Sequence, residues 1–89
     1  MQSTDAEILA LRALTHLARS PDDWDSFMAL SGVRPQEVRA RAGEPEFLAA
    51  VFDFILACDR RARGFCETEG IDPRVLTRAR RALPGGNEA

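Results

Sequence analysis

Residues 27–38 have the sequence FMALSGVRPQEV, and residues 65–76 repeat its pattern as FCETEGIDPRVL. At corresponding positions both stretches carry phenylalanine, glycine, a β-branched residue, proline and an aliphatic residue. A repeat of this length is typical of two copies of one helix-turn-helix unit. The anchor residues of the repeat are Phe27, Gly32, Val33, Pro35 and Val38 in the first copy and Phe65, Gly70, Ile71, Pro73 and Leu76 in the second.

Glycine and proline mark the turn in each copy. A glycine just past a helix can adopt the left-handed conformation that ends it, and the Val or Ile that follows packs back onto the helix. The proline favours the first position of the next helix, because its missing N–H would have no partner there. We therefore expect Gly32 and Gly70 to end helices, and Pro35 and Pro73 to begin them.

The length and composition indicate one small globular domain over residues 1–89, with an ordered core from about residue 4 to residue 83 and a frayed tail at 84–89. Hydrophobic residues make up 45% of the chain and charged residues 29%, which lies outside the range of disordered proteins. The net charge of −2 gives no general attraction to nucleic acids or anionic membranes. Nucleic-acid binding would therefore need a local basic patch.

The chain opens without a charged-then-apolar leader, and its longest apolar run, residues 47–58, is interrupted by Asp53 and too short to span a membrane. Cys58 and Cys66 are about 12 Å apart along the axis if both lie in one continuous helix, which is too far for a disulfide. We expect buried free thiols in a cytoplasmic protein.

Capping signals and apolar periodicity predict helices over about 4–19, 21–31, 35–42, 46–58 and 73–83, and no segment has the two-residue period of a strand. Thr4-x-x-Glu7 has the form of a capping box, and Ser20 and Asp72 precede prolines as caps. The residues expected to face inward are Ile8, Leu11, Leu14, Leu17 and Ala18 in the first helix, Trp24, Phe27, Met28 and Leu30 in the second, and Val75, Leu76, Ala79, Ala82 and Leu83 in the last.

The segment from Glu46 to Cys58 is the apolar centre of the chain. Its large apolar residues cover an arc of about 200° of the helix surface. The remainder of the surface holds Ala49, Ala50, Asp53 and Ala57. A helix so widely apolar must be surrounded by others. The expected fold is therefore all-α: a compact bundle of five or six helices, made of two degenerate helix-turn-helix units around this central helix.

Asp59 would lie inside the apolar arc if the central helix continued unbroken to Glu69. A carboxylate in that position needs a partner or a bend in the helix. We predict a structural ion pair between Arg39 and Asp59 at the seam between the two units, because an arginine fork satisfies a partly buried carboxylate well. Arg63 is the competing partner.

No pattern in the sequence is typical of an enzyme. His16 is the only histidine, and no nucleophile or carboxylate stands near it at a catalytic spacing. Glycine-rich phosphate loops and metal-ligand clusters are also missing from the sequence. We therefore expect no catalytic residues, no cofactor, no metal and no small-molecule substrate.

The segment 27–42 resembles a DNA-binding helix-turn-helix, in which Arg34, Gln36, Arg39 and Arg41 would contact nucleic acid. Three features weaken this interpretation: Met28 stands where a small alanine is favoured, the second helix is very short, and acidic residues dilute the positive field. Another basic face is predicted on the last helix, where Arg74, Arg78 and Arg81 recur at helical spacing.

The alternative that we favour is a non-catalytic module that binds another protein or a second copy of itself. The chain has many large side chains for its length: Trp24, Phe27, Met28, Phe47, Phe52 and Phe54. Either these fill one core, or some of them form an exposed patch that binds a partner. The core interpretation is favoured for Trp24, Phe27 and Phe65.

Three stretches together resemble a known protein family: Phe-x-x-x-Ser-Gly-Val-x-Pro-x-x-Val-Arg at 27–39, Glu-Pro-x-Phe-Leu-Ala-Ala-Val at 44–51, and Gly-Ile-x-Pro at 70–73. The chain resembles an uncharacterised alphaproteobacterial family of short helical proteins, domain-of-unknown-function family 3572. The resemblance covers the chain from about Ala6 to Leu83 and implies a helical bacterial protein with no assigned activity. The family pattern has Glu near the position of Asp59, a departure that would change the reach of the predicted pair.

Overall fold

A computed structural model of the chain describes residues 1–85. Within these residues it contains six α-helices, one short 3-10 turn and no strand, so the expected all-α fold is confirmed. The elements are α1 (Ser3–Ala18), α2 (Pro21–Ser31), η1 (Pro35–Glu37), α3 (Val38–Arg41), α4 (Pro45–Leu56), α5 (Asp59–Glu69) and α6 (Pro73–Arg81). The end of the predicted frayed tail, residues 86–89, lies outside the described residues.

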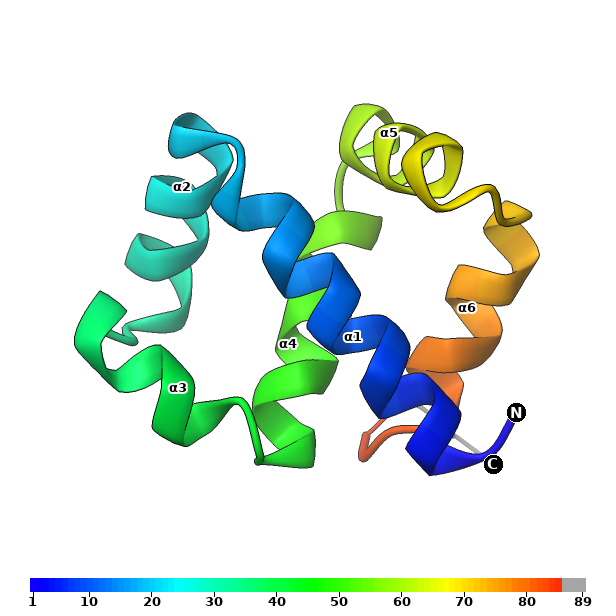
Figure 1. Cartoon of the computed structure of the whole chain (residues 1–89), viewed down its shortest axis with the longest axis horizontal. Helices are drawn as coiled ribbons and strands as arrows, with labels where there is room; N and C mark the ends of the chain where they lie inside the picture. The colour runs from blue at the N-terminus through cyan, green and yellow to red at the C-terminus, as the bar shows by residue number, and fades with distance from the viewer. Residues whose placement is uncertain (86–89) are drawn as a thin grey trace.

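Two helices form the centre of the molecule. α1 lies across α4, with α2 and α3 on one side of this pair and α5 and α6 on the other (Figure 1). α1 contacts α2, α4 and α6, whereas α4 contacts α1, α2, α5 and α6. The two helix-turn-helix units therefore flank a pair of helices.

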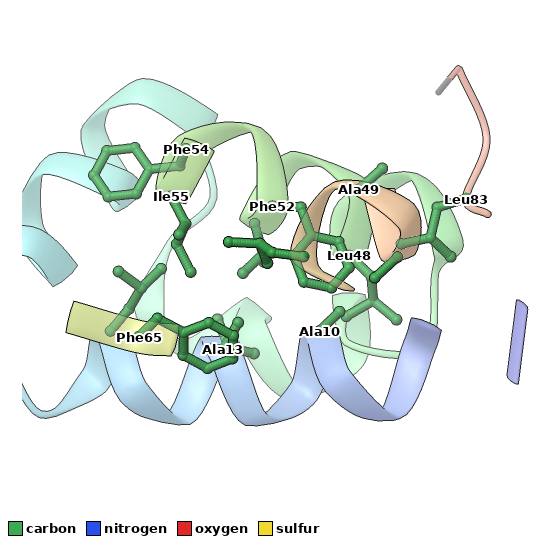
Figure 2. Packing of buried hydrophobic residues seen from close by; sticks show 14 of the residues in the cluster. Ala10, Ala13, Leu48, Ala49, Phe52, Phe54, Ile55, Phe65 and Leu83 are labelled. Carbon is green, nitrogen blue, oxygen red and sulfur yellow. The ribbon is translucent and has the colours of Figure 1, made fainter. Parts of the chain in front are cut away.

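α4 is the most deeply buried helix, as its apolar arc predicts. Its buried residues are Phe47, Leu48, Ala49, Val51, Phe52, Phe54 and Ile55. Ala49 lies outside the apolar arc and is nevertheless only 4% exposed. Leu83, which follows α6, belongs to the same buried cluster as Ala49, and Figure 2 shows both toward the same end of this cluster. The side of α4 that is not strongly apolar is thus partly covered as well.

α1 packs through its small residues. Its buried residues are Ala6, Ala10, Ala13, Leu14 and Leu17, and Figure 2 shows Ala10 and Ala13 on the side that faces α4. The prediction that Ile8 and Leu11 face inward was wrong, because they are 54% and 41% exposed. Ala18, also predicted to face inward, is exposed. Small residues at a crossing let two helix axes approach closely, which bulky side chains there would prevent.

Each turn of the repeat contains a left-handed glycine, as predicted. Gly32 ends α2 with φ of 74°, and Gly70 ends α5 with φ of 67°. Phe27, Val33, Phe65 and Leu76 are buried, and Val38 and Ile71 are partly buried. The copies differ in their second helix, because Pro35 opens a 3-10 turn and a four-residue α3, whereas Pro73 opens the nine-residue α6.

The predicted helix caps form only in part. The carboxylate of Asp72 accepts a hydrogen bond from the backbone N–H of Arg74 at 2.8 Å, as expected of a cap. The pKa of Asp72 is lowered chiefly by the hydrogen bond from the Arg74 side chain, and secondly by this backbone bond. The capping box at Thr4 was a wrong prediction, since α1 begins at Ser3 and has no side-chain cap. Ser20 occupies the N-cap of α2 without a side-chain cap bond.

The chain bends between α4 and α5, although neither glycine nor proline stands there. Cys58 adopts an extended conformation, with φ of −136° and ψ of 117°. The Nε of Arg61 donates a hydrogen bond to the carbonyl oxygen of Phe54 at 3.3 Å. This carbonyl belongs to the last turn of α4, where helix carbonyls lack partners within the helix. Arg61 therefore caps α4 from the following helix.

Candidate functional site

A shallow apolar hollow lies between α2 and α4. Its volume is about 200 Å³. Its wall consists mainly of aromatic, leucine and alanine side chains, with one hydroxyl and one carboxylate. We call it the α2–α4 groove; its residues are Phe27, Leu30, Ser31, Ala50, Asp53, Phe54 and Ala57.

Leu30 is the most exposed large apolar side chain in residues 1–85, with 77% of its surface accessible. The prediction that Leu30 faces inward was wrong. α2 turns its fully buried Phe27 toward the core and leaves Leu30 at the edge of the groove. Helical periodicity gives the direction of a side chain, but it does not show how wide a strip of the helix its neighbours cover.

Aromatic and cationic contacts fix the floor of the groove. The ring of Phe54 lies 5.3 Å from that of Phe27, centroid to centroid, at an interplanar angle of 54°. The guanidinium carbon of Arg61 lies 3.9 Å from the Phe54 centroid, a cation–π distance. Phe54 is only 5% exposed. Its ring is therefore held from two directions and presents a fixed surface to the groove.

Asp23, near the start of α2, ties α2 to α5. Its Oδ1 lies 3.4 Å from Nη2 of Arg60 and 3.7 Å from Nη1 of Arg61. Arg61 also contacts Phe54 at the end of α4, so one side chain links three helices. Arg61 thereby connects the two helices that form the walls of the groove.

Asp53, on the α4 wall, is bound by Arg80 of α6. The Nε of Arg80 donates to Oδ1 at 2.6 Å and Nη2 donates to Oδ2 at 3.2 Å. Our sequence analysis missed this pair. The sequence nevertheless contains one indication of this pair. Arg80 lies four residues after Leu76 and three residues before Leu83, both of which were expected to face inward. This spacing places Arg80 on the buried side of α6.

The residues proposed for nucleic-acid contact in the first unit are exposed, but carboxylates hold two of them. Nη2 of Arg34 lies 3.2 Å from Oε2 of Glu37, and Nε of Arg41 lies 2.8 Å from Oε1 of Glu44. The backbone N–H of Arg34 also lowers the pKa of Glu37. Gln36 and Arg39 are exposed, and no ion pair involves Arg39 within residues 1–85.

The second unit presents a basic stripe. Arg74, Thr77, Arg78 and Arg81 are all exposed on α6 at helical spacing. Arg74 pairs with Asp72, at 3.2 Å between Nη2 and Oδ2. Arg78 and Arg81 also line a larger hollow, of about 740 Å³, at the ends of α1 and α6.

The structure does not bring Arg39 and Asp59 together. Their predicted pair depended on a continuous helix that would carry Asp59 into the apolar arc. Because the chain bends at Cys58, Asp59 becomes the first residue of α5 and is exposed. Arg39 lies exposed on α3, and the competing Arg63 is also exposed. Because the bend leaves Asp59 exposed to solvent, its carboxylate needs no ion-pair partner.

Comparison with known protein families gives a match for the chain. Residues 3–86 match the model of the family described as protein of unknown function DUF3572. The chain belongs to this family. No curated protein and no solved structure matches it. The description of DUF3572 assigns no activity to the family.

The side chains of this DUF3572 protein that could carry chemistry are dispersed. The His16 ring lies edge-on to Phe65, with centroids 5.4 Å apart, and lines a small hollow near the ion pair of Arg12 and Glu69. Within residues 1–85, no three His, Cys, Asp or Glu side chains are placed to share a metal ion. No helix of the described chain has the length and hydropathy needed to cross a bilayer.

The two cysteines are free thiols in different surroundings. Cys66 is buried, as expected, and burial raises its pKa. Cys58 is half-buried at the N-cap of α5, which corrects the expectation that both are buried. The backbone N–H of Arg61 lowers the pKa of Cys58.

Proposed function

We propose that this DUF3572 protein is a non-catalytic protein-protein interaction or assembly module of the cytoplasm, which binds its partner through the α2–α4 groove. The observation that carries the proposal is the position of Leu30, 77% exposed at the edge of an apolar hollow. The two free thiols support a reducing compartment.

An exposed leucine beside an apolar hollow is a typical feature of a binding surface. A single exposed apolar residue is common on soluble proteins, but an apolar depression next to it can take a side chain of a partner and cover the leucine at the same time. Grooves between two helices bind amphipathic helices in this way. The groove residues thus offer both a projection and a recess.

The fixed floor of the groove supports binding further. Phe54 is held between Phe27 and Arg61, and Arg80 neutralises Asp53 at the rim. A surface that is already ordered loses little conformational entropy when a partner binds. Neutralised charge at the rim also reduces the desolvation cost.

Site-specific photo-crosslinking in the native host tests the proposal. A photoreactive amino acid at position 30 is expected to give one defined covalent adduct, and Ala57→Arg is expected to abolish it. Ala57 is exposed and lines the groove, so the arginine blocks the recess without entering the core.

Position 8 provides the matched control, because Ile8 is 54% exposed on α1 and is not a groove residue. The same photoreactive group there is expected to give no defined adduct. The proposal would be contradicted if positions 30 and 8 gave adducts in equal yield, or if position 30 gave no adduct.

Nucleic-acid binding is the second candidate function. The observation that favours it is the exposed stripe of Arg74, Arg78 and Arg81 on α6, since no acidic residue lies between Pro73 and Gly85. The α5–α6 unit is a better candidate than segment 27–42, because α6 is a regular helix of nine residues, whereas α3 has only four.

Fluorescence anisotropy with a labelled DNA duplex distinguishes these surfaces. Binding through α6 would weaken steeply with salt, because each neutralised phosphate releases counterions. Replacing Arg74, Arg78 and Arg81 together by Gln would abolish it, whereas replacing Arg34, Arg39 and Arg41 together would leave it unchanged. The opposite pattern would favour the first unit, and no binding at low salt would exclude this function.

A further inference from the structure

The α2–α4 groove and a side chain that suits it lie on the same patch of the molecule. Leu30 projects from the edge, and the recess beside it is lined by Phe27, Ala50, Phe54 and Ala57. A two-fold symmetric dimer needs such a patch, because each copy offers the same surface to the other. We propose that the groove takes Leu30 of a second copy, so that the chain forms a symmetric homodimer; this rests on the protein-binding function proposed above.

The charges along α2 favour a second copy as the occupant. Residues 21–31 contain Asp22, Asp23 and Asp25 and no basic residue. Asp23 is engaged by α5, whereas Asp22 and Asp25 are exposed. Just beyond the other end of α2 stands Arg34, whose side chain is 70% exposed. One α2 segment therefore carries both signs of charge, at opposite ends.

This arrangement also fixes the relative direction of the two helices. An antiparallel pair of α2 helices sets the acidic start of each beside Arg34 of the other and opposes their dipoles. A parallel pair would bring Asp22 toward Asp22, which is repulsive. The exposed pair of Arg34 with Glu37 is easily exchanged, because pairs of this kind contribute little stability.

The same edge of α2 carries the contact residues. Asp22, Ser26 and Leu30 are spaced by four residues, lie along one edge of the helix and are all exposed. With the two-fold axis at the height of residue 28 along α2, Leu30 of one copy faces Ser26 of the other, while Arg34 faces Asp22. Small Ser26 leaves room for the incoming leucine.

The outer face of α1 serves as a comparison. Ile8 and Leu11 are 54% and 41% exposed there, and neither lines the α2–α4 groove. This face therefore takes no part in the proposed contact.

Sedimentation equilibrium over a range of protein concentrations measures the dimer directly. The wild-type protein is expected to approach twice the chain mass of 9.8 kDa. Leu30→Ser is expected to weaken dimerisation about tenfold or more, as for a central apolar contact. Ile8→Ser is expected to leave it unchanged. Thermal unfolding followed by circular dichroism verifies that both variants fold.

Charge reversal tests the antiparallel geometry. Arg34→Asp is expected to weaken the dimer, and adding Asp22→Arg is expected to restore it. Arg39→Asp, a reversal of an exposed arginine outside α2, serves as the control. If Leu30→Ser weakens the dimer but Arg34→Asp and Asp22→Arg leave its affinity unchanged, the antiparallel arrangement is overturned.

A wild-type protein that is monomeric at all concentrations, or a Leu30→Ser variant that dimerises as well as the wild type, would overturn the homodimer. The photo-crosslinking experiment separates this failure from that of the proposed function. An adduct of position 30 with a different protein would leave the binding function standing and overturn only the second copy as occupant.

Discussion

Arg80 of α6 and Asp53 of α4 form a bidentate ion pair between the two helices, with Nε and Nη2 of the guanidinium donating to the two carboxylate oxygens. Nη1 of the same arginine donates to the carbonyl oxygen of Pro84 at 3.0 Å. Arg80 therefore fastens the end of α6 to α4, and it neutralises the only carboxylate that lines the α2–α4 groove.

Replacing Arg80 by Ala is expected to lower the free energy of unfolding by about 1 kcal/mol, because a bidentate, partly buried pair is lost. Arg78→Ala is the control, since Arg78 is exposed on the same helix, and is expected to change stability little. Urea denaturation measures both values. Equal losses in the two variants would show that the pair contributes no specific stability.

Gly70→Ala is expected to destabilise the protein by about 1 kcal/mol, because alanine is strained in the left-handed conformation. Gly70 has φ of 67°, and a Cβ there would meet no atom within 4 Å, so backbone strain alone sets the cost. Gly64→Ala, within α5, is expected to stabilise by about 0.5 kcal/mol or more, since alanine favours helix. Denaturation curves in which both variants shift in the same direction would contradict this account.

Ala10→Leu is expected to lower stability by about 1–3 kcal/mol, because the larger side chain overpacks the crossing of α1 and α4. Ala10 is 0% exposed. Ala18→Leu introduces the same side chain at an exposed position of α1 and is expected to be nearly neutral. If Ala10→Leu were tolerated equally well in thermal unfolding, the close approach of α1 to α4 would not depend on small residues.

Cys58 is expected to react with Ellman's reagent much faster than Cys66. A lowered pKa gives Cys58 a larger thiolate fraction at neutral pH, whereas the raised pKa and burial of Cys66 suppress both its ionisation and its accessibility. Cys58→Ser removes the fast phase of the reaction, and Cys66→Ser retains it. A fast phase that survives Cys58→Ser would refute this assignment.

The site was harder to predict from sequence than the fold. The burial of Phe27 was expected from its apolar pattern, whereas the groove itself was not predicted. Leu30 at its edge was expected to face inward, and the Asp53–Arg80 pair was missed. The predicted Arg39–Asp59 pair was wrong because it required a continuous helix. Asp59 in the apolar arc called for either a partner or a bend, and the structure has the bend, at Cys58.

The sequence by itself determined where most helices begin and end, and that α4 is surrounded. Helix termination at Gly32 and Gly70 depends on the backbone freedom of single residues, and the burial of α4 follows from its broad apolar surface, so both are local properties. Only the tertiary structure decided which side of α1 and α2 faces the core, that the chain bends between α4 and α5, and which charges pair. Those features depend on how closely two helices approach and on groups far apart in the chain, which local patterns do not encode.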